Sequence, residues 1–122
     1  WRNPNLLRWH GRPYLIDHGA ALYFHHDWSS AATVPTRAYP APRDHVLMPV
    51  AAPIADAHAA LAPRVTAELL DEVLGLVPDE WLAEDGADLG ARRAAYRDLL
   101  LARGAQAEAW LPALEVAHAS YL

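Results

Sequence analysis

The stretch NPNLLRWHGRPYLIDHG, residues 3–19, combines turn-forming, apolar and acidic residues in a way that the rest of the chain does not. Residues 6–9 and 13–16 read as two short strands, because β-branched, aromatic and leucine side chains alternate with polar ones. The His10-Gly11-Arg12 segment between them contains a glycine, which can adopt the positive φ of a tight hairpin turn. The pattern predicts a β-hairpin that ends at Asp17, with the Asp17 carboxylate exposed.

The character of the sequence changes near residue 30. Three prolines fall within residues 29–43, and this segment is predicted to be a loop because proline lacks a backbone donor. From about residue 64 the apolar period becomes helical. One stripe is predicted to face the core, opposite Glu68, Asp71 and Glu72; its members are Val65, Leu69, Val73 and Leu76. Pro63 suits the first turn of this helix, and Pro78 suits its end.

Three further helices are predicted after this one. A short helix begins near Pro78, a longer one covers residues 88–103, and the last covers residues 106–120. Gly104 is the predicted C-terminal stop of the longer helix. Its inward side chains are predicted to be Leu89, Tyr96, Leu99 and Leu100. The fold class is therefore α+β and mostly helical, with a hairpin segment (residues 1–28) followed by a helical bundle (residues 29–122).

Composition limits the classes of function. The chain has 122 residues, 53% of them hydrophobic, which is enough for one domain with a real core. A net charge of −5 with no basic run argues against nucleic-acid binding. No apolar stretch approaches the roughly 18 residues that cross a bilayer. The absence of cysteine suits a reducing compartment, and we expect a cytoplasmic protein without a membrane partner.

An aspartate at the end of an apolar strand, followed closely by glycine, can present its carboxylate to a hard cation. Mg²⁺ prefers such oxygen ligands and usually takes one or two carboxylates together with substrate phosphates. An amide oxygen from Asn3 or Asn5, at the entry to the first strand, would complete a two-residue metal site with Asp17. The residues alone also permit a simpler interpretation, in which Asp17 caps a turn and Asn3-Pro4-Asn5 forms one.

The segment RNPNLLRWHGRPYLIDHGAALYFHHDW, residues 2–28, resembles the catalytic-loop to metal-loop region of the HipA-like kinases, which have a protein-kinase-like fold. RDHVLMPVAAPIADAHAAL and LVPDEWLAE, farther along, resemble the helical C-terminal lobe of that family. The resemblance implies that Asp17 binds Mg²⁺ and that Asn3 is the catalytic-loop asparagine, with Asn5 as the alternative. Asn5-Leu6-Leu7 is similar to the Asn-Leu-Leu of ordinary protein kinases, whereas the Asp-x-x-x-x-Asn spacing of the family favours Asn3.

The resemblance implies transfer of the ATP γ-phosphoryl group to a serine or threonine hydroxyl of a protein. The implied cofactors are Mg²⁺ and ATP, held by Asn3, Asn5, Asp17 and Gly19, with Asn3 and Asp17 catalytic. A protein substrate is the implied partner, and an antitoxin is a candidate second partner. His18 replaces the usual phenylalanine of the metal motif, at a position expected to pack rather than to bind the metal.

Residues 1–122 contain no counterpart of the family's catalytic-base aspartate, phosphate-covering loop or ATP-anchoring lysine. We therefore expect a C-terminal lobe fragment that is inactive on its own. Two other classes stay open: a small-molecule kinase of the aminoglycoside-phosphotransferase type, and a non-enzymatic helical interaction module in which Asp17 is structural. A zinc site at His25-His26-Asp27 is disfavoured, because adjacent residues of an extended chain point in opposite directions.

Overall fold

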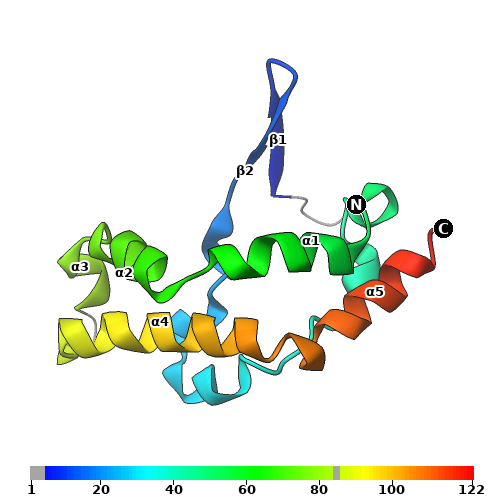
Figure 1. Cartoon of the computed structure of the whole chain (residues 1–122). Coiled ribbons are helices and arrows are strands. Elements are labelled where there is room, and N and C mark those ends of the chain that lie inside the picture. The colour runs from blue at the N-terminus through cyan, green and yellow to red at the C-terminus, as the bar shows by residue number, and fades with distance from the viewer. Residues whose placement is uncertain (1–4, 84–85) are drawn as a thin grey trace.

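The computed structural model describes residues 5–83 and 86–122. It is mostly helical with one small antiparallel hairpin, which confirms the predicted α+β class (Figure 1). The strands are β1 (Leu6–Trp9) and β2 (Arg12–Leu15), and the α-helices are α1 (Ile54–Leu61), α2 (Ala67–Gly75), α3 (Asp79–Leu82), α4 (Leu89–Ala105) and α5 (Leu111–Ala119). Single 3₁₀ turns connect them; they are η1 (His18–Ala20), η2 (Tyr23–His26), η3 (Trp28–Thr33), η4 (Pro42–Asp44), η5 (Met48–Val50), η6 (Ala62–Arg64) and η8 (Ala107–Ala109).

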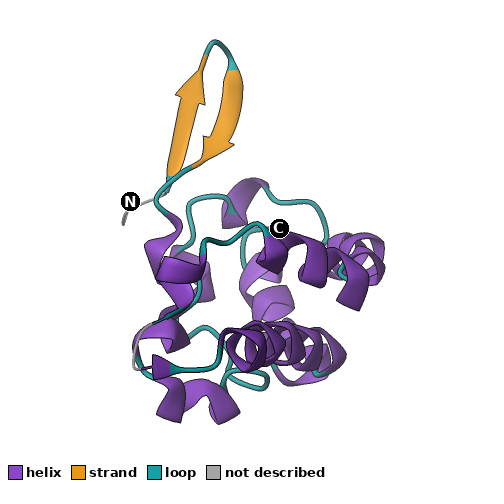
Figure 2. Ribbon diagram, turned by 90° about the vertical axis from the view of Figure 1, so that its left-hand side faces the viewer, coloured by secondary structure: helices purple, strands orange, loops and turns teal. Residues whose placement is uncertain are grey.

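The hairpin forms where the sequence predicts it, with a tighter turn. His10 and Gly11 have φ angles of 47° and 78°, which are the positive values that a two-residue type I′ turn requires. Arg12 therefore belongs to β2, directly opposite Trp9, and not to the turn. Figure 2 shows the hairpin projecting away from the helices, with only its base near them.

The core lies where α4 meets α2, α3 and the η2 turn. It consists of Phe24, Leu70, Leu74, Leu82, Tyr96 and Leu99. The inward face predicted for α4 is confirmed, since Tyr96 and Leu99 are buried and Leu89 and Leu100 pack against the same cluster. The helix runs one residue beyond Gly104, to Ala105, so the predicted glycine stop is wrong.

The predicted core stripe of α2 is wrong. Its four side chains are all exposed, at 47% for Val65, 42% for Leu69, 50% for Val73 and 80% for Leu76. Leu70 and Leu74, on the adjacent face of α2 about 100° around the helix, are the buried residues. The helix therefore has two apolar stripes. When the stripe of Leu70 and Leu74 is buried, the exposed Asp71 carboxylate lies 3.3 Å from the Arg97 guanidinium on α4.

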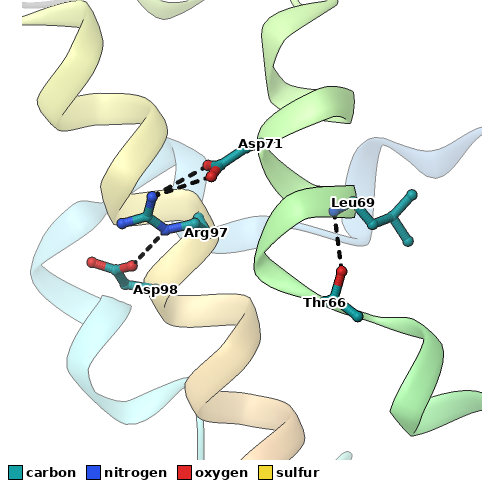
Figure 3. A network of polar contacts seen from close by, with 5 residues as sticks. All are labelled: Thr66, Leu69, Asp71, Arg97 and Asp98. Atoms are coloured by element: carbon teal, nitrogen blue, oxygen red, sulfur yellow. Dashed lines mark hydrogen bonds and ion pairs between the residues drawn. The ribbon is translucent and has the colours of Figure 1, made fainter.

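Figure 3 shows how α2 begins and how it is tied to α4. The Thr66 hydroxyl accepts a hydrogen bond from the Leu69 amide at 3.2 Å and so acts as the N-cap. The helix thus starts later than predicted, because Pro63 belongs to η6 and not to the first turn of α2. On α4, the Arg97 guanidinium contacts Asp71 and its sequence neighbour Asp98 (Figure 3).

Two segments differ from the predicted layout. The proline-rich segment after residue 28 is not wholly loop, since residues 28–33 form η3 with Asp27 as a side-chain cap on the Ser29 amide. The helix α1 was not predicted, and it packs on α5 at the end of the molecule away from α2. Within residues 5–83 and 86–122, no helix is both long and apolar enough to cross a membrane.

Candidate functional site

The open end of the hairpin brings Asn5 and Asp17 together. Both residues have a positive φ, 45° for Asn5 and 53° for Asp17. Asparagine and aspartate tolerate this left-handed backbone conformation better than most residues. The Asn5 side-chain Nδ2 donates to the backbone oxygen of Asp17 at 2.9 Å. The Ile16 amide donates to the backbone oxygen of Asn5, also at 2.9 Å. These two bonds close the base of the hairpin and hold the Asn5 side chain against the backbone of Asp17.

The Asp17 carboxylate is not used as a helix cap. Asp17 precedes η1, but its side chain makes no capping hydrogen bond to the described residues, and the residue is exposed as predicted. Asp17 itself makes the turn, while Gly19 is not among the described glycines with positive φ. A Cβ on Gly19 would lie 4.0 Å from Asp17 Oδ1, an ordinary contact distance, so the carboxylate extends toward Gly19.

The Asn5 side-chain oxygen, Oδ1, is the second candidate ligand atom at this site. Asn5 Oδ1 is buried and has no hydrogen-bond partner within residues 5–83 and 86–122. A buried amide oxygen without a hydrogen-bond donor lowers the stability of the fold by about 1–3 kcal/mol. A cation bound to this oxygen would remove that cost. Amide and carboxylate oxygens are both ligand types that Mg²⁺ takes. Asn3, the other predicted ligand, lies outside the described residues.

A pocket of about 670 Å³ opens beside this site. His18 and Gly19 form part of its wall; the remaining lining residues are Leu22, His25, His26, Leu74, Val77, Glu80, Trp81, Leu82 and Tyr96. The volume lies in the range of small-molecule sites, which are mostly apolar with a few polar groups. His18 was expected to pack in the interior, but its side chain is exposed at this pocket.

Most of this pocket could not be predicted from the sequence. Its polar lining comes from η1 and η2 on one side and from α3 and α4 on the other, two parts of the chain that meet only through tertiary packing. His25 Nδ1 is hydrogen bonded to the Tyr96 hydroxyl, and the His25 ring stacks on the Tyr96 ring at a centroid distance of 6.0 Å. Tyr96 was predicted to be a core residue, which it is, but its hydroxyl contact with His25 follows from no motif.

The paired histidines lie on a 3₁₀ turn and not on an extended chain, so the geometric reason given against zinc is wrong. The His25 and His26 rings meet edge to face, with centroids 5.4 Å apart. Among the residues that the structure describes, no group of three or more histidine, aspartate or glutamate side chains is placed to hold a metal ion. The Asn5 and Asp17 pair is a smaller set, of the kind that Mg²⁺ completes with water and phosphate oxygens.

No family model, curated protein or solved structure was found to match this chain.

Proposed function

We propose that this chain is the helical, metal-binding lobe of an ATP-dependent kinase similar to the HipA-like family. Its reaction would transfer the ATP γ-phosphoryl group to a serine or threonine hydroxyl of a protein. The observation that carries the proposal is the base of the hairpin, where the buried Asn5 Oδ1 has no hydrogen-bond partner among residues 5–83 and 86–122. The same Asn5 side chain is bonded to the backbone of Asp17, whose side chain is exposed. These are the two residue types that kinases use to hold Mg²⁺ on ATP phosphates.

The chain's own residues would act by positioning. Mg²⁺ on the phosphates of ATP would neutralise the charge that develops during phosphoryl transfer. Asn5 would present its amide oxygen, and the Asn5 Nδ2 bond to the backbone of Asp17 would keep the two ligands in register. Gly19 would leave the approach to the carboxylate open. The pocket beside Gly19 would hold the phosphoryl acceptor. Glu80 and His26 line this pocket and would hydrogen bond to polar groups of the acceptor.

Asn5 is proposed as the amide ligand, because its side chain bonds to the Asp17 backbone and its Oδ1 has no partner in the part of the chain that the structure describes, which does not include Asn3. We also propose that residues 1–122 do not turn over ATP alone, since they lack counterparts of the family's proton-accepting aspartate and ATP-anchoring lysine. Metal binding, and not catalysis, is therefore the property to measure on this chain.

The test is a titration of the 122-residue chain with Mn²⁺, a paramagnetic substitute for Mg²⁺, followed by NMR line broadening of backbone amides. We expect the amides of Asn5, His18 and Gly19 to broaden first. Asp17→Asn should weaken Mn²⁺ binding at least tenfold, because an amide is nearly isosteric with the carboxylate but carries no charge. Asp56→Asn, at an exposed aspartate on α1, is the matched control and should bind as the unmodified chain does.

The two asparagines are separated by the same titration. Asn5→Ala should lose affinity, and Asn3→Ala should keep it. Broadening that is unchanged in Asp17→Asn, or that centres elsewhere on the chain, would refute the metal site and with it the kinase proposal.

A non-enzymatic interaction module is the second candidate. It is favoured by the exposed apolar stripe of α2, formed by Val65, Leu69, Val73 and Leu76, because contiguous apolar surface on a small domain often marks a contact with another protein. A small-molecule kinase of the aminoglycoside-phosphotransferase type would use the same metal ligands and would differ only in its acceptor. The Mn²⁺ titration separates the module from both kinases, because only a kinase needs the metal.

A further inference from the structure

The two outer edges of the β-hairpin are chemically different. In an antiparallel pair, residues that exchange hydrogen bonds alternate with residues whose backbone groups point outward. The Ile16 amide donates to the Asn5 oxygen, and Leu7 pairs with Tyr14 two residues farther along. The outward-pointing residue of β1 between these pairs is therefore Leu6, and the next one is Arg8.

The corresponding outward positions of β2 are Pro13 and Leu15, opposite Arg8 and Leu6. Proline has no N–H, so the β2 edge lacks a donor at that position, and proline is one means by which proteins block the pairing of an edge strand. The β1 edge keeps both donors and both acceptors. A third strand would therefore pair with β1 and not with β2.

The hairpin also lacks the packing that normally stabilises a sheet. An isolated two-stranded hairpin is marginal in water, and three or more strands or a covering element are usually needed. The apolar side chains of the strands are open to solvent, including Trp9 at 60% and Leu15 at 71% exposure. Leu7 and Trp9 lie on one face of β1, and Arg8 lies on the other.

Charge indicates what kind of strand would pair. Residues 5–16 include Arg8 and Arg12 and no aspartate or glutamate, although the whole chain has a net charge of −5. A second copy paired through β1 would bring two arginine-bearing hairpins together. An acidic strand would instead place a carboxylate beside Arg8.

We propose that the open edge of β1 binds an extended segment of a partner polypeptide by strand addition. The segment carries an acidic side chain opposite Arg8 on one face and apolar side chains beside Leu7 and Trp9 on the other. Backbone hydrogen bonds to Leu6 and Arg8 supply affinity, and the alternating side chains supply specificity. The proposal does not depend on the proposed metal site, although Leu6 directly follows Asn5 in the chain.

The proposal is tested with two synthetic peptides on the full 122-residue chain, Ser-Thr-Val-Glu-Val-Thr-Ser and the same peptide with lysine in place of glutamate. Hydrogen exchange and NMR shifts of the Leu6, Arg8 and Leu15 amides are measured during each titration. We expect the glutamate peptide to slow exchange at Leu6 and Arg8 at least tenfold and to leave Leu15 unchanged. The lysine peptide should bind at least tenfold more weakly. In Arg8→Glu this preference should reverse.

Each of three results would overturn the proposal. These are no slowing at saturating glutamate peptide, slowing at Leu15 instead of Leu6 and Arg8, and slowing that depends on protein concentration without peptide, which would indicate a second copy. A peptide carrying an N-methyl group on the central residue is the backbone control and should not bind. If Arg8→Glu disrupts the hairpin, the two peptides on the unmodified chain still decide the outcome.

Discussion

The hairpin and helix α4 are both rich in apolar side chains, yet they are stabilised in different ways. None of the strand residues 6–9 and 12–15 is buried, whereas α4 buries Tyr96 and Leu99 in the core cluster. The hairpin is held by its type I′ turn, its strand pairing and the Asn5 side chain at its base. Helix α4 is held by side-chain packing. The candidate metal site therefore depends on backbone conformation, while the pocket beside it depends on side-chain packing.

The largest effect is expected from Phe24→Ala. Phe24 is 3% exposed and contacts the rings of Trp28 and Tyr96, so the substitution would leave a cavity between η2 and α4. Replacing a buried phenylalanine with alanine usually costs about 3–5 kcal/mol of unfolding free energy. Urea unfolding monitored by helical circular dichroism should show this loss. The matched control is Leu15→Ala on the hairpin, at a 71% exposed site, which should change the free energy by less than about 0.5 kcal/mol. A comparable loss in both variants would contradict the division between packed and unpacked regions.

An intermediate effect on stability is expected when one glycine in each region is replaced with alanine. The effect should have opposite signs in the hairpin and in α4. Gly11 has a φ of 78° and Gly104 lies within α4, and no other described side chain or backbone atom lies within 4 Å of a Cβ added to either. Gly11→Ala should destabilise the hairpin by about 1 kcal/mol, since left-handed φ is unfavourable for alanine. Gly104→Ala should stabilise the helical part by roughly 0.5 kcal/mol, because alanine is the better helix former.

Hydrogen exchange at the Tyr14 amide reports on the hairpin, and helical circular dichroism reports on α4. Gly11→Ala should speed exchange at Tyr14 and leave the helical melting temperature unchanged. A fall in the helical melting temperature of Gly11→Ala would show that the hairpin and the helices unfold together.

The smallest effect is expected from the pH dependence of stability in the helical part. The pKa of Glu68, in the first turn of α2, lies below its ordinary value of 4.5, first because its carboxylate accepts a bond from its own backbone amide and second because of the Thr66 side chain. A lowered pKa in the folded state stabilises the fold above the unfolded value, and that contribution is lost as the pH falls through the folded value. Glu68→Gln should therefore lower the helical melting temperature slightly at neutral pH and not below the folded pKa. A difference that persists in strong acid would mean that the glutamate acts by packing.

The hairpin was predictable because its information is local. A glycine at the turn, a proline on one strand and an aspartate after the last apolar residue each have a direct backbone meaning. The core stripe of α2 was not predictable, because Leu69 and Leu70 lie on different faces of one helix and both belong to apolar stripes. The buried stripe is the one that packs in the cluster with Tyr96 and Leu99 of α4, and these residues lie farther along the chain.

The candidate site shows the same limit. Asp17 could be predicted as a candidate ligand from the strand before it and the glycine after it. Its predicted exposure is confirmed. The spacing of the family favours Asn3 as the amide partner, whereas Asn5-Leu6-Leu7 fits the ordinary protein-kinase motif. The proposal of Asn5 rests on its φ of 45° and on its bond to the Asp17 backbone, neither of which is encoded by residue type alone.

The contact between η2 and α4 has a consequence for how the chain is made. His25 and Tyr96 are 71 positions apart, and Phe24 is separated from its Tyr96 contact by nearly the same length of chain. At about 5–20 residues per second, a ribosome needs roughly 4–14 s to add that length. During this interval the hairpin can form from local contacts, but Phe24 and Trp28 lack their ring contacts with Tyr96 of α4. We therefore expect a nascent chain that stops before α4 to bind chaperones through these two aromatic side chains, and to release them once Tyr96 has emerged.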